Sequence, residues 1–61
     1  MEFRITMDDV KANYKNVVEM NYDELPPIFK YFGASARARN EHGREVEIYH
    51  VNNDTCITIT R

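Results

Sequence analysis

The sequence predicts an α+β domain of two layers, in which one helix packs on a mainly antiparallel sheet of five short strands. Three observations support this fold class: residues 34–61 and residues 1–7 alternate apolar and polar side chains, and residues 21–33 carry helical spacing. Alternation with period two is typical of half-buried strands, whereas spacing of three and four residues indicates a helix. The expected order is ββαβββ, within one small domain spanning residues 1–61, because a chain of this length builds a single core.

The first twenty residues predict one strand, and the segment after that strand has two interpretations. Residues 1–7 place Met1, Phe3, Ile5 and Met7 on one side of a strand. In the favoured interpretation a turn covers about residues 8–13, and a second strand from about 14 to 21 pairs with the first, because aspartate and asparagine suit loops. In the alternative, residues 8–20 form a helix that begins with a capping box of Thr6 and Asp9, and the order becomes βααβββ.

Residues 21–33 predict the main helix. Asn21 or Asp23 supplies an N-cap acceptor, and Pro26 and Pro27 are tolerated because the first turn of a helix has no partners for its N–H groups. Gly33 ends the helix. The apolar face is expected to consist of Leu25, Ile28, Phe29 and Phe32.

Residues 34–61 predict three strands joined by two tight turns. If residues 41–43 form a three-residue loop with Gly43 in the left-handed conformation, Asn40 faces Arg44. The pairs expected on the outer side of the sheet are Arg37 with Glu47 and Arg39 with Glu45. These pairs fix the register and neutralise one another.

The inner side of the same hairpins is expected to be apolar. There, Ala38 faces Val46 and Ala36 faces Ile48. A two-residue turn at Asn53 and Asp54 then sets Ile48 against Ile59 and His50 against Ile57. All three strands therefore present one apolar face to the helix.

Composition argues against several classes of function. The net charge of −2 is far from the basic excess of most small nucleic-acid binders. A single serine, one cysteine, two histidines and two glycines give neither a nucleophile–base pair, nor zinc-ligand spacing, nor a phosphate-binding loop. We therefore expect a non-enzymatic protein with no cofactor and no metal.

The location is expected to be the cytoplasm. Cys56 is the only cysteine, so no disulfide can form within the chain. The first four residues do not resemble a secretion leader, and no apolar run approaches the ~20 residues of a membrane span. A membrane partner is not expected.

The candidate partner-binding residues lie on the outer face of the predicted sheet. Tyr49, Val51 and Cys56 share this face and are flanked by Arg37 and Arg39, a composition typical of protein interfaces. We expect a small intracellular regulator or inhibitor, of phage or mobile-element origin, that binds an unidentified protein through this face or through an edge strand. An edge strand would also allow a homodimer.

The alternative function is association with nucleic acid through a basic hairpin that carries Arg37, Arg39 and Arg44. Residues 39–48 are loosely similar to the arm hairpin of HU-type architectural proteins, which would imply DNA binding. The proline at the tip of such arms and the helices that precede them are absent from this sequence, so we do not assign the chain to that family.

Overall fold

A computed structural model describes residues 5–60 and confirms the α+β class with five strands. Along the chain the elements are β1 (Ile5–Thr6), α1 (Met7–Asn13), β2 (Asn16–Glu19), the 3₁₀ helix η1 (Tyr22–Glu24), α2 (Pro27–Phe32), β3 (Ala36–Arg39), β4 (Glu45–Asn52) and β5 (Thr55–Thr60). The first predicted strand is confirmed at β1, except that Met7 begins α1, and residues 1–4 of that prediction lie outside the described residues.

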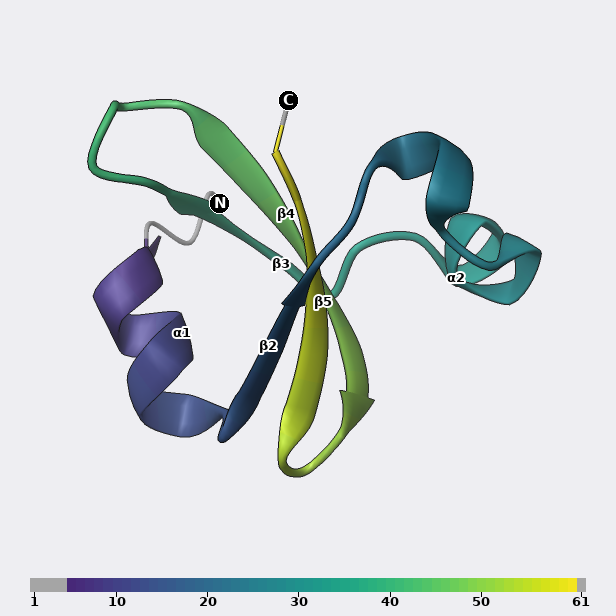
Figure 1. The fold of residues 1–61 in the computed structure, drawn as a ribbon, viewed down its shortest axis with the longest axis horizontal. Helices are drawn as coiled ribbons and strands as arrows, with labels where there is room; N and C mark the ends of the chain where they lie inside the picture. Colours follow the sequence, from purple (N-terminus) through teal and green to yellow (C-terminus); the bar gives the residue numbers. More distant parts are fainter. Residues whose placement is uncertain (1–4, 61) are drawn as a thin grey trace.

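The sheet is mixed. Its order is β1-β3-β4-β5-β2, with antiparallel pairing among the three central strands and parallel pairing at both edges. The prediction that the second strand pairs with the first is wrong, because α1 carries the chain across one face and delivers β2 to the opposite edge, beside β5 (Figure 1). The strands β1 and β2 run in the same direction, which is consistent with a helical crossover between them. Two strands joined by a tight hairpin would instead run antiparallel.

Both interpretations of residues 8–20 are partly right. The helix α1 begins at the predicted capping box: the Asp9 amide donates to Thr6 Oγ1 at 3.2 Å, and the Thr6 amide donates to Asp9 Oδ2 at 2.9 Å. The helix ends after Asn13, and β2 comes next, as the favoured interpretation expected. The structure therefore contains a helix between the first two strands and also keeps the second strand.

The β3–β4 hairpin has the predicted register. Arg37 is paired with Glu47 and Arg39 with Glu45, and the Asn40 amide donates to the Arg44 carbonyl at 3.0 Å. The left-handed position is taken by Gly43, at φ 76°. The turn agrees with this register, because only glycine adopts such a φ without steric cost.

The β4–β5 hairpin departs from the predicted register by one residue. Asn52 faces Thr55 across the expected two-residue turn, but a bulge between His50 and Asn52 shifts the pairing of all strand residues beyond it by one position. Tyr49 therefore faces Ile57, and His50 faces Cys56. Because side chains alternate along a strand, a shift of one residue moves a whole strand's side chains to the opposite face.

The core is divided between the two faces of the sheet. On one face, Val10 of α1 packs on the central strands, in a buried cluster made up of Val10, Ala38, Val46, Ile48 and Cys56. On the other face, Leu25 packs in a second buried cluster made up of Leu25, Tyr49, Ile57 and Ile59. Figure 1 accordingly shows α1 on one side of the strands and the segment containing η1 and α2 on the other. The predicted inner face is thus covered by α1 instead of α2.

Candidate protein-interaction surface

The short helix α2 begins later than its apolar spacing suggests. Leu25 and Pro26 are both extended, with ψ angles of 127° and 141°, and helical geometry starts at Pro27. Each of these two residues precedes a proline, and the proline ring disfavours helical backbone in the residue before it. Gly33 closes the helix, its amide donating to the Phe29 carbonyl at 2.8 Å.

This break separates Leu25 from the face it was predicted to share. Leu25 is 2 % exposed and lies in the core, whereas Ile28 is 60 % exposed and Phe32 is 74 % exposed. The prediction that Ile28 and Phe32 belong to the buried face of the helix is therefore wrong. Tyr31 is 84 % exposed beside them, so one helix of six residues presents three large side chains to solvent.

We call the exposed side chains Ile28, Tyr31 and Phe32 the α2 patch. The helix that carries them is attached to the core through Phe29. Phe29 is half-buried against the second cluster, and its ring meets that of Tyr49 edge-on, with 6.4 Å between centroids. A depression of about 280 Å³ lies alongside, lined in part by Ile28, Phe29, Phe32 and Tyr49. The patch therefore combines projecting aromatic groups with a neighbouring concave, mostly apolar surface.

The segment that carries the α2 patch has few charged side chains, and most of them are acidic. Residues 21–33 contain Asp23, Glu24 and Lys30 as their only charged side chains. The Lys30 ammonium lies over the ring of Tyr22, with 4.7 Å to the centroid, so the lysine covers part of an aromatic face. Tyr31 and Phe32 contact each other edge-on at 5.2 Å between centroids.

The predicted partner-binding face of the sheet does not exist as expected. Tyr49 is 4 % exposed and Cys56 is fully buried, and the bulge places them on opposite faces, in different core clusters. Val51 alone of the three is exposed. The Tyr49 hydroxyl donates to Glu47 Oε1 at 3.0 Å inside the structure. The expectation that Tyr49, Val51 and Cys56 form one exposed surface is therefore wrong.

The arginines of the β3–β4 hairpin are exposed but engaged. Arg37 Nη1 lies 3.5 Å from Glu45 Oε1, and Arg39 Nη1 donates to the Gly43 carbonyl at 3.1 Å. Arg37 thus pairs diagonally with Glu45, although its register partner is Glu47. Two of the three arginines proposed for nucleic acid are therefore occupied by the hairpin itself.

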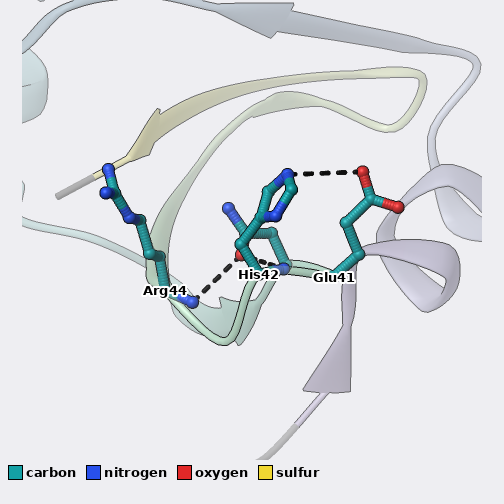
Figure 2. A network of polar contacts seen from close by, with 4 residues as sticks. Glu41, His42 and Arg44 are labelled. Atoms are coloured by element: carbon teal, nitrogen blue, oxygen red, sulfur yellow. Dashed lines mark hydrogen bonds and ion pairs between the residues drawn. The ribbon is translucent and has the colours of Figure 1, made fainter.

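The tip of this hairpin is a compact polar turn (Figure 2). Asn40 Oδ1 accepts from the amides of both His42 and Arg44, at 2.9 and 3.0 Å. His42 Nε2 lies 3.6 Å from Glu41 Oε1, and the Arg44 side chain extends away from this pair. The turn therefore offers one arginine directed away from a histidine–glutamate pair, instead of a continuous basic surface.

The histidine at the end of the predicted inner face has a specific partner. The Tyr14 hydroxyl and His50 Nδ1 are 2.8 Å apart, and the two rings meet edge-on at 5.7 Å between centroids. The His50 amide also lies 3.4 Å from Ser35 Oγ. The contact between Tyr14 and His50 ties the residue after α1 to β4, which positions the helix on the sheet.

Other candidate chemistry is sparse in residues 5–60. Within that range, no group of three or more histidine, cysteine, aspartate or glutamate side chains is placed to hold a metal ion. Burial raises the pKa of the Cys56 thiol above its ordinary value. None of the helices described has the length and apolar character needed to cross a membrane.

The sequence offers Tyr31, with Tyr22, as a second interface candidate, but sequence reasoning missed the exposure of Ile28 and Phe32, because the spacing of Leu25, Ile28, Phe29 and Phe32 was interpreted as one continuous helical face. The signal that would have found it is the dipeptide Pro26-Pro27, which forces the preceding residues to be extended. Comparisons of this chain with protein-family models, with curated protein sequences and with solved structures found no match.

Proposed function

We propose that this protein is a non-enzymatic interaction module that binds another protein through the α2 patch. The observation that carries the proposal is the exposure of Ile28, Tyr31 and Phe32 on a single short helix. Exposed apolar groups are unremarkable when scattered, but gathered on one element they mark interaction sites. Aromatic side chains are also the commonest energetic anchors of protein interfaces. Binding alone would then carry the activity, as in a small regulator or inhibitor.

The charge around the patch favours a protein partner over a membrane. Helices that bind membrane surfaces carry lysine and arginine on their polar face, because they are attracted to anionic lipids. Residues 21–33 have two carboxylates and one lysine, and the lysine is stacked on Tyr22. A partner with an apolar pocket rimmed by basic residues would match both the aromatic groups and the acidic surroundings.

The proposal is tested by comparing immobilised variants in capture from host lysate. Phe32→Ser removes the centre of the patch, and Val51→Ser is the matched control, because Val51 is an exposed apolar side chain on a different element. We expect at least one protein to bind the wild type and Val51→Ser and to be lost from Phe32→Ser, with circular dichroism unchanged. Equal capture by both variants, or no capture by the wild type, would refute the proposal.

The nucleic-acid alternative has no such observation in its favour. Arg37 and Arg39 are engaged with Glu45 and the Gly43 carbonyl, which weakens the field available to phosphate. Phosphate-driven binding is strongest at low salt, because released counterions drive it. We therefore expect no shifted band with duplex DNA at low ionic strength. A band that disappears in Arg37→Ala and Arg44→Ala would overturn this expectation.

A further inference from the structure

The strand β2 forms one edge of the sheet with half of its backbone directed outward. The Asn16 and Met20 amides donate toward β5, to the carbonyls of Asp54 and Thr58 at 2.8 and 3.1 Å. The Val18 carbonyl also faces β5, since it lies 3.5 Å from Thr58 Oγ1. Backbone groups alternate sides along a strand, so the N–H and C=O groups of Val17 and Glu19 point away from the sheet.

This edge is open in the part of the chain that the structure describes. β2 is the last strand in the sheet order, and Figure 1 draws no other segment in front of it. The opposite edge, β1, is only two residues long. Proteins usually protect long open edges, because unpaired backbone groups are a template for another strand.

The side chains along β2 are complementary to a second copy of the same strand. An antiparallel pairing about a two-fold axis at Val17 sets Val17 against Val17. If the pairing extends by one residue beyond β2, it also sets Lys15, the bend residue just before the strand, against Glu19 of the other copy, twice per dimer. Lys15 and Glu19 are both exposed, and neither forms an ion pair within residues 5–60. Opposite charges that face one another across strands stabilise the pairing.

Neighbouring registers lack this complementarity. Side chains on facing strands must point to the same side, so the axis can move only to Asn16 or to Val18. The first places Lys15 opposite Val17, and the second places Val17 opposite Glu19. All three registers place the outward backbone groups of Val17 in reciprocal hydrogen-bonding positions, but only the register centred on Val17 matches both charges.

We infer that two copies of this chain associate through β2, in antiparallel register about Val17, to form one continuous sheet across the dimer. The two-fold symmetry is that of most homodimers. A contact limited to one strand from each copy is small, so the dimer is weak and depends on protein concentration. This inference is independent of the α2 patch.

The test exchanges the two charges and measures association by sedimentation equilibrium up to millimolar concentration. Lys15→Glu and Glu19→Lys each replace two attractive pairs with two repulsive ones, so each should weaken the dimer by about tenfold. Mixing the two variants should restore association, because every facing pair in the mixed dimer is again of opposite charge. Lys11→Glu is the control, since it makes the same change of net charge on α1.

The outcomes separate cleanly. A wild type that is monomeric at every concentration overturns the inference, as does a dimer that is weakened equally by Lys11→Glu and Lys15→Glu. If a single variant fails to fold, the double exchange Lys15→Glu with Glu19→Lys decides the matter, because it keeps the composition. Association of the double exchange like the wild type supports the inference, and a monomer overturns it.

Discussion

Replacing Leu25 with alanine tests how the segment before α2 is anchored. Leu25 is 2 % exposed and contributes to the cluster with Tyr49, Ile57 and Ile59. Truncating a buried leucine to alanine costs about 2–5 kcal/mol, which includes the cavity that remains. Because Leu25 lies between η1 and α2, where the backbone can partly relax, we expect a loss of about 3 kcal/mol, within that range.

That loss is large compared with the total stability. At about 0.05–0.15 kcal/mol per residue, a chain of this length has a free energy of unfolding of about 3–9 kcal/mol. Urea denaturation measured by circular dichroism is the appropriate assay. With a slope near 1 kcal/mol per molar urea, the midpoint of Leu25→Ala should fall by about 3 M.

The matched control is Ile28→Ala. Ile28 is 60 % exposed on the same segment, so its truncation should change the free energy of unfolding by no more than about 0.5 kcal/mol. A continuous helix beginning near Asn21 would instead bury both side chains. Equal destabilisation by Leu25→Ala and Ile28→Ala would therefore refute the extended Leu25-Pro26 segment and the exposed α2 patch together.

The cap of α1, the buried thiol and the two glycine turns give three further predictions. Hydrogen bonds from Thr6 lower the pKa of Asp9, so Asp9→Asn should reduce stability to urea at pH 7, and the difference should vanish as pH falls below 3.8 and Asp9 is protonated. Burial raises the pKa of the Cys56 thiol above 9.0, so the free energy of unfolding should decline above pH 9.0, where the thiol of the unfolded chain ionises first. Because Cys56 is buried, an aromatic disulfide reagent should label it only after denaturation. Gly33, at φ 79° and ψ 176°, occupies a region essentially restricted to glycine, so Gly33→Asn should lower the melting temperature more than Gly43→Asn. A Cβ at either position would meet no neighbouring atom within 4 Å, so the difference reports backbone strain, and equal effects would contradict this.

Local chemistry was sufficient where a turn or cap depends on a few adjacent residues. The capping box at Thr6 and Asp9 and the loop that ends at Gly43 both formed as their residue types indicate, and the loop set the register of β3 against β4. In each case the deciding interactions join residues only three or four positions apart. Such contacts form whatever the rest of the chain does.

The predicted site failed where a single residue changed the geometry. The bulge beside Val51 moved Cys56 to the face that α1 covers, and Leu25 packs over Tyr49 on the other face, so the surface that alternation had predicted is absent. Nothing in the alternation of residues 45–60 marks a bulge. The bulge brings Ile57 onto the same face as Tyr49, where both pack with Leu25, a contact between segments far apart in the sequence.

The sequence by itself therefore determined the α+β class, the capped start of α1, the end of α2 and the β3–β4 register, because each rests on short-range hydrogen bonds or on the backbone limits of glycine and proline. Tertiary structure alone decided which helix covers which face, that β2 joins the edge beside β5, and that the α2 patch faces solvent. Those choices depend on which apolar groups from distant segments pack together. The hydrophobic effect is non-directional, so an apolar pattern shows that a face is buried but does not show which element covers it.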